Sequence, residues 1–190
     1  RGRGRRYKVK ILVLGIGNLL FGDEGIGVHF IKYMGEKYQF DGEHQIDIID
    51  GGTLAQRLIP IIVEYDHLII IDTINAPGVK AGEVYFFDFD AVPDAVDWQG
   101  SAHEVEMLQT LNMMDLAGDR PPTMIMGVVP TVIEATEFSL SEGVAAAVPL
   151  MEKTLLDYLK KMNVHAVKKA EVDMQAILPN SFRALDAYSV

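Results

Sequence analysis

Hydrophobic and polar residues follow one another along the chain in blocks that predict buried strands and amphipathic helices. The run from Val9 to Gly15 is almost wholly apolar and rich in Ile and Val, which is typical of a strand covered on both faces. From Glu24 to Tyr38, apolar residues recur at helical spacing, and Asp23 is the expected N-cap of that helix. The chain therefore opens with a strand, a glycine-containing turn and a helix.

The same cycle repeats further along. Two strand-helix-strand steps predict a mainly parallel sheet. The segment GEVYFFDFD follows turn residues without an intervening helix, so we expect it to enter the sheet antiparallel at one edge. The remaining expected elements are strands at 45–50, 67–72 and 123–130 and helices at about 53–63, 103–117 and 141–162.

Composition indicates a single α/β domain over residues 8–163, with a C-terminal extension at 164–190. Residues 1–7 form a basic tail that we expect to be disordered or a remnant of cloning. The first ten residues hold six bases and no acid, leaving 11 bases against 27 acids, a net charge of −16, in the rest of the chain. Such a body repels nucleic acid.

Two absences in the sequence bear on where the protein works. No apolar segment approaches the roughly 18–20 residues that a transmembrane helix needs. The chain has no cysteine, which excludes disulfides, thiolate metal ligands and a cysteine nucleophile. We therefore expect a cytoplasmic monomer that binds neither membrane nor nucleic acid.

The turn GIGNLLFGDEGIG, at residues 15–27, resembles a nucleotide-binding glycine loop but departs from it. Leu20 replaces the third glycine, and Asp23 and Glu24 place two negative charges where a phosphate would bind. A purely structural interpretation is also open, in which Asp23 caps the helix and Glu24 interacts with the helix dipole. A Rossmann-type nucleotide-dependent enzyme stays an alternative.

Acidic residues follow three of the expected strands. Glu24, Asp50 and Asp72 all lie just beyond the carboxyl ends of strands, which converge on one crevice in an open parallel sheet. Either aspartate also suits a structural role in its own turn. His103 lies near the start of the next helix, where a surface role is equally open. Together, one imidazole and two carboxylates suit a borderline divalent metal such as nickel or zinc.

Five segments, in order, give the sequence a family resemblance over about residues 9–160. They are ILVLGIGNLLFGDEGIGV, IDGGT, DHLIIIDTI, SAHEVEMLQTL and MGVVP with FSLSEGVAAAVP. The chain resembles the hydrogenase maturation endopeptidases of nickel-iron hydrogenases. The resemblance implies a three-layer sandwich in which a five-stranded twisted sheet, mainly parallel with one antiparallel edge strand, carries helices on both faces.

The resemblance also implies an activity and a partner. Members of the family cut a short C-terminal peptide from the nickel-loaded precursor of the hydrogenase large subunit. Their three nickel-binding residues correspond to Glu24, Asp72 and His103. The nickel is expected to belong to the substrate, so no metal need be tightly bound to the free enzyme.

Our hypothesis for the chemistry is attack by water on a carbonyl that the substrate nickel polarises. Glu24 or Asp50 is expected to orient the water, which makes Glu24, Asp50, Asp72 and His103 the candidate catalytic set. A serine nucleophile has no support in the sequence. A noncatalytic nickel chaperone for hydrogenase assembly, using the same three metal ligands, is the main alternative. The remaining histidines, His29 among them, are expected to be solvated or to make local hydrogen bonds.

Overall fold

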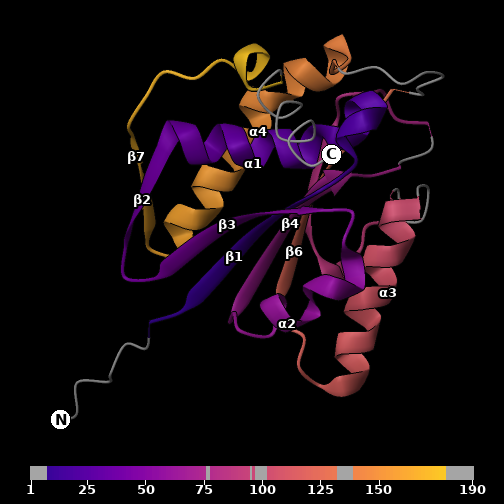
Figure 1. The fold of residues 1–190 in the computed structure, drawn as a ribbon, viewed down its shortest axis with the longest axis vertical. Coiled ribbons are helices and arrows are strands. Elements are labelled where there is room, and N and C mark those ends of the chain that lie inside the picture. The colour runs from indigo at the N-terminus through magenta and orange to yellow at the C-terminus, as the bar shows by residue number, and fades with distance from the viewer. Residues whose placement is uncertain (1–7, 76–77, 95, 97–101, 132–138, 179–190) are drawn as a thin grey trace, which may run out of the picture.

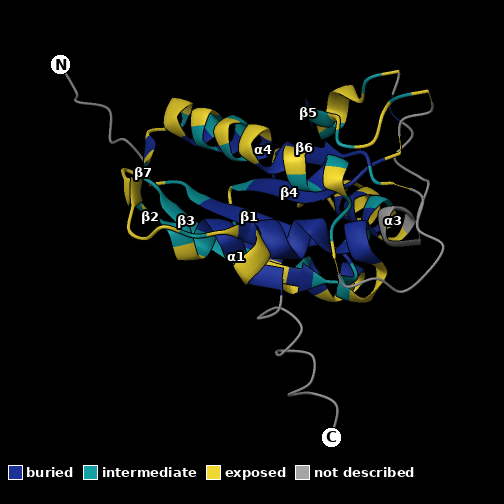
Figure 2. Ribbon diagram, turned by 90° about the horizontal axis from the view of Figure 1, so that it is seen from above, coloured by how far each residue is buried: buried dark blue, intermediate teal, exposed yellow. Residues whose placement is uncertain are grey.

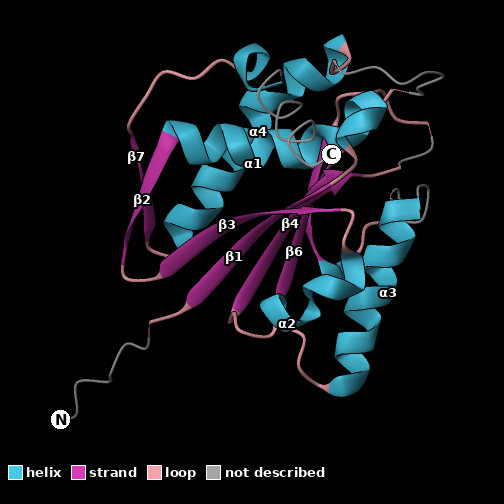
Figure 3. Cartoon of the chain, viewed as in Figure 1, coloured by secondary structure: helices cyan, strands magenta, loops and turns pink. Residues whose placement is uncertain are grey.

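A central five-stranded sheet organises the molecule (Figures 1 and 3). The computed structural model describes residues 8–75, 78–94, 96, 102–131 and 139–178, without the side chains of residues 102–105. The strand order is β3-β1-β4-β6-β5. All neighbours are parallel except β5, which pairs antiparallel with β6 at one edge, as the sequence predicted. The strands are β1 (Lys10–Ile16), β3 (Gln45–Gly52), β4 (His67–Thr73), β5 (Val84–Asp88) and β6 (Thr123–Val128).

Helices cover both faces of this sheet, so the predicted three-layer architecture is confirmed (Figure 1). Along β1, Ile11 and Val13 face one core while Leu12 and Leu14 face the other, because successive side chains of a strand point to opposite sides. All four are at most 1% exposed. The continuous apolar run read from the sequence is thus a strand buried on both faces (Figure 2).

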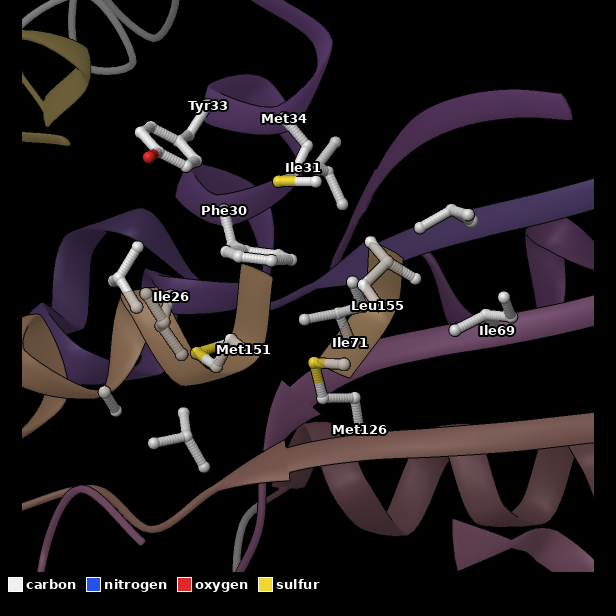
Figure 4. Close-up of a cluster of buried hydrophobic side chains, with 14 of the residues drawn as sticks. Ile26, Phe30, Ile31, Tyr33, Met34, Ile69, Ile71, Met126, Met151 and Leu155 are labelled. Atoms are coloured by element: carbon white, nitrogen blue, oxygen red, sulfur yellow. The ribbon is translucent and has the colours of Figure 1, made fainter. Parts of the chain in front are cut away.

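The first core lies between the sheet and two long helices, α1 (Ile26–Lys37) and α4 (Glu142–Lys161). Figure 4 shows Phe30 and Met34 of α1 pointing toward the same cluster as Met151 and Leu155 of α4. The N-terminus of α4 is capped as expected, because the Ser141 hydroxyl accepts the N–H of Val144 at 3.3 Å. Pro149 lies inside α4 without ending it.

The second core lies under the opposite face and is covered by α3 (Ala102–Ala117) and a short two-part segment. That segment, expected as one helix over 53–63, consists of a 3-10 helix, η2 (Ala55–Leu58), and a single turn, α2 (Ile59–Ile62). The expectation of one helix was wrong for a local reason. Pro60 has no N–H to donate to the Gln56 carbonyl, so one α-helical hydrogen bond is missing here, and Ala55 has a φ of +39°, which is outside the α-helical region.

A small antiparallel ribbon of β2 (Tyr38–Gly42) and β7 (Val164–Lys168) follows α1 and α4. Neither strand was predicted. Val164, Met174 and Ile177 are buried in the first core. The predicted C-terminal extension therefore packs on the domain at least as far as Leu178, which is 5% exposed. The predicted basic tail at 1–7 and residues 179–190 lie outside the described residues.

A short 3-10 helix, η3 (Phe89–Ala91), follows β5 at the sheet edge. Another, η1 (Leu19–Gly25), joins β1 to α1 and is described below. Within the described residues, no helix has the length and apolar character that crossing a membrane would require.

Candidate active site

The carboxyl ends of the strands bring two of the predicted site residues to one rim of the sheet. Gly15, near the end of β1, pairs with Asp50 of β3 on one side. On its other side it pairs with Ile71 of β4, the residue before Asp72. Asp50 and Asp72 therefore lie at nearly the same level near the ends of their strands, on either side of β1. This is the end of a parallel sheet at which ligands and substrates bind in open α/β proteins.

Glu24 is held at this rim by the turn that follows β1. The N–H of Gly17 donates to the carbonyl of Gly52 at the end of β3, 3.0 Å away. The N–H of Asn18 donates to the carbonyl of Glu24 at 3.1 Å, and the Asn18 side chain accepts the N–H of Leu20 at 2.9 Å. These bonds fold η1 back over the ends of β1 and β3, where Glu24 is half-buried.

Gly17 is required by the closeness of this turn. Its φ is +153°, and a Cβ added to it would lie 2.0 Å from the carbonyl oxygen of Glu24. A side chain at position 17 would therefore displace the backbone that carries Glu24. The glycine that resembled part of a phosphate loop in the sequence instead allows the turn to close on itself.

Asp23 does not cap α1, and that prediction was wrong. The N-cap of α1 is Gly25, without a side-chain capping bond. Asp23 is 1% exposed, and its two oxygens accept backbone N–H groups from Thr131 at 2.9 Å and Ser141 at 2.6 Å. Because both oxygens are engaged, the carboxylate joins η1 to the end of the β6 segment and to the start of α4.

Asp72 is the most deeply placed of the candidate acids. It is 1% exposed, and one oxygen of its carboxylate, Oδ1, accepts the N–H of Thr73 at 2.8 Å. The strand β4 that positions it is the central strand of the sheet, where Leu68 through Ile71 are paired on both sides and Asp72 is paired with Gly127 of β6. Asp72 therefore lies one residue beyond the part of β4 that is paired with both neighbouring strands.

Asp50 lies at the surface, where its Oδ1 accepts the N–H of Gly52 at 2.8 Å. This is the turn-stabilising contact that the structural interpretation of Asp50 predicted. Partial desolvation raises the pKa of Asp50, although the Gly52 N–H and the charge of Lys32 act in the opposite direction. A raised pKa brings a carboxylate closer to the range in which it can accept and return a proton.

His103 lies in the first turn of α3, one turn before the buried Met107. Its side chain is not among those described, so the grouping of Glu24, Asp72 and His103 stays a prediction. Among the side chains that are described, no three histidine, aspartate or glutamate groups form a metal-binding cluster. Asp50 therefore does not complete such a cluster with Glu24 and Asp72.

His29 of α1 is a buried residue that sequence reasoning treated as solvated or locally bonded. It is 1% exposed, and its ring packs against Gly25, where an added Cβ would lie 3.1 Å from Nε2. Burial, with a contribution from Lys32, lowers the pKa of His29 to about 4. Nothing in the sequence signalled this burial. His29 lies between Val28 and Phe30, but a polar residue does not count toward the hydrophobic pattern of a helix.

Comparisons with known proteins agree with this architecture. Residues 28–158 match the family model described as HycI, hydrogenase maturation protease. The chain is 50% identical over 157 residues to Protein HydD of Wolinella succinogenes, covering 82% of this chain and 99% of that protein. It is 28% identical to the hydrogenase 2 maturation protease of Escherichia coli, covering 86% of this chain and 99% of the relative.

A solved structure extends the likeness to three dimensions. The hydrogenase maturating endopeptidase HybD from E. coli superposes with a TM-score of 0.74 at 28% identity, covering 84% of this chain and 98% of that one. These matches exclude the alternative of a nucleotide-dependent enzyme. The segment between β1 and α1 is also an acidic 3-10 turn, which does not suit a phosphate. The chain belongs to the hydrogenase maturation protease family, and it is a peptide-bond hydrolase.

Proposed function

We propose that this protease removes a short C-terminal peptide from the nickel-loaded precursor of a nickel-iron hydrogenase large subunit. The proposal is supported by the positions of Glu24 and Asp72. Both residues lie at the carboxyl end of the sheet, Glu24 in the turn that follows β1 and Asp72 at the end of the neighbouring strand β4. In a chain of this family, that pair with His103 from α3 supplies the nitrogen and oxygen ligands that a borderline metal accepts.

In this proposal the nickel is part of the substrate and serves as the recognition handle. Glu24, Asp72 and His103 occupy its open coordination positions, which brings the scissile carbonyl beside the cation. Two acidic side chains in a partly dehydrated rim favour a cation over an anion, because the local charge is negative. The precursor without nickel would lack this handle and would bind weakly.

The cut itself is hydrolysis by water. The nickel polarises the carbonyl, and the oxygen of a water molecule bonds to the carbonyl carbon while a carboxylate takes up the proton. The carbon–nitrogen bond then breaks, and the proton passes to the leaving amine. Asp50 or Glu24 is the proton acceptor, and the raised pKa of Asp50 suits it to that part. We place this reaction in the cytoplasm, with the enzyme acting as a monomer.

The test is incubation of the purified protein with precursor in nickel-loaded and nickel-free forms, followed by mass spectrometry of the intact chains. We expect a shortened precursor and a released C-terminal peptide only when nickel is present. Glu24→Gln and His103→Ala should lower the rate by at least about 100-fold, since each removes a ligand of the recognised cation. Circular dichroism checks that both variants are folded.

Matched controls change the same residue types at exposed positions away from the rim. Glu36→Gln on α1 and His165→Ala on β7 should cleave at the wild-type rate. Full cleavage by both rim variants would contradict the assignment of the site. A precursor that stays intact while it remains bound to the wild-type protein would indicate a nickel escort in place of a protease acting on this substrate.

A further inference from the structure

A polar cavity of about 550 Å³ lies beside the rim, between the segment that follows β3 and helix α3. One wall consists of residues 53–57, and the other is formed by Glu106 and Gln109 of α3. Figure 1 shows η2 and α2 alongside α3, and η2 and α3 are in contact. The volume falls in the range of sites that hold ligands, which is roughly 300–1,000 Å³.

The long side chains that line this cavity are exposed and do not bind one another. Among the described residues, the side chains of Gln56, Arg57, Glu106 and Gln109 make no hydrogen bond or ion pair. Arg57 and Glu106 carry opposite charges on opposite walls and still do not pair. A ligand entering here would therefore break no contact within the protein, and it would find donors and acceptors on both sides.

Each wall of the cavity is close in the chain to a residue of the proposed cleavage site. Thr53 directly follows Gly52, whose N–H holds the Asp50 carboxylate. Glu106 lies one helical turn after His103 on α3. The lining residue Ala55 has a φ of +39°, a backbone conformation that non-glycine residues rarely adopt.

We propose that this cavity, the residue 53–57/α3 groove, holds an extended segment of the precursor chain next to the bond that is cut. The inference rests on the proposed function and names the substrate-binding surface of the same site. Each glutamine carboxamide offers one acceptor and two donors, which match the alternating N–H and C=O groups of an extended peptide. Leu54, 48% exposed at the groove edge, adds apolar contact for a substrate side chain.

The first test measures cleavage of the nickel-loaded precursor by the double variant Gln56→Ala/Gln109→Ala. Neither residue is placed in the catalytic set, so we expect kcat within about twofold of wild type and KM raised about tenfold, from two lost hydrogen bonds. The matched control, Gln39→Ala/Gln175→Ala, changes two exposed glutamines outside the groove and should leave both constants unchanged. An unchanged KM in the groove variant would overturn the inference.

The second test does not depend on cleavage. A photoreactive benzoylphenylalanine is placed at position 109 in the groove or at position 39 on β2, and the protein is irradiated with the same precursor. Crosslinking at 109 and not at 39 is the expected result, and the reverse pattern contradicts the groove. If the wild-type enzyme leaves the precursor uncut, the proposed function fails, and the crosslink still decides whether the precursor occupies the groove.

Discussion

Asp23 connects three segments that are far apart in the sequence through one carboxylate. Its oxygens accept N–H groups from Thr131 and Ser141, and its neighbour Glu24 is a candidate site residue. A carboxylate has only acceptors, so it can bind two N–H groups without a competing donor of its own. This buried side chain therefore fixes the turn that carries Glu24 against the segment that follows β6 and against the start of α4.

Replacement of Asp23 by asparagine should destabilise the protein. The amide keeps one acceptor but turns an NH2 group toward the second backbone N–H, which loses its partner. Hydrogen bonds to charged groups contribute about 1.5–3 kcal/mol, so we expect the free energy of unfolding of Asp23→Asn to fall by that amount. Urea denaturation followed by circular dichroism measures it.

The matched control is Asp41→Asn, at an exposed position on β2. It should change the unfolding free energy by less than about 0.5 kcal/mol. Equal midpoints for Asp23→Asn and the wild type would mean that the two backbone contacts add nothing to stability.

At the level of single residues, the sequence located side chains but not their partners. It placed Asp50 and Asp72 correctly at strand ends, because an apolar run that stops at an acid marks the end of a buried strand. It could not assign Asp23, since Thr131 and Ser141 lie more than a hundred positions away, and the local alternative of a helix cap looked equally suitable. The role of His103 stays a prediction.

The turn between β1 and α1 is the element that brings Glu24 to the rim. Its geometry depends on Gly17, because no side chain fits between that residue and the Glu24 carbonyl. The bond from the Asn18 N–H to the same carbonyl would be lost if the turn opened. The position of Glu24 is thus set by backbone contacts within the element.

Gly17→Ala should therefore impair cleavage more than it impairs folding. The new Cβ would meet the Glu24 carbonyl at 2.0 Å, so the turn must shift and carry Glu24 with it. We expect at least a tenfold loss in kcat/KM on the nickel-loaded precursor, since displacement of a site group by about 1 Å costs up to about 100-fold. Steady-state kinetics measures the loss.

Gly35→Ala on α1 is the control for that substitution. A Cβ at position 35 meets nothing within 4 Å, and alanine favours a helix over glycine by about 1 kcal/mol. This variant should be slightly more stable than the wild type and fully active. Wild-type kinetics in Gly17→Ala would show that the turn does not set the geometry of the site.

Element types were read well from the sequence where the hydrophobic pattern was long. The five strands of the main sheet follow apolar runs, and helices α1 and α4 follow helical periodicity. The β2–β7 ribbon was missed because each strand has five residues and its partner is distant in sequence. Pairing of that kind depends on how α1 and α4 end beside each other, which no local pattern records.

The stability of the whole molecule depends on pH because one of its histidines, His29, is buried without a charge. In the folded protein the pKa of His29 is lowered to about 4, from an ordinary value of 6.5. Below pH 6.5 the unfolded chain takes up a proton there that the folded chain does not. Folding is therefore favoured above pH 6.5, and this contribution is lost as the pH falls toward 4.

Comparison of the wild type with His29→Leu isolates that contribution from the carboxylates. Between pH 7 and pH 4, the wild type should lose about 3 kcal/mol more unfolding free energy than the variant, because about 2.5 pKa units separate its two states. Denaturant titrations at several pH values measure the difference. Parallel pH curves for the two proteins would contradict a neutral His29 in the folded state.

The proposed function depends most on Glu24, Asp72 and His103 sharing one cation at the rim. Anomalous diffraction at the nickel edge, from crystals soaked in a nickel salt, tests this directly. We predict one strong peak at the carboxyl end of β4, with all three side chains as ligands. A nickel peak elsewhere, or a structure in which the three side chains lie too far apart to reach one ion, would contradict the proposal.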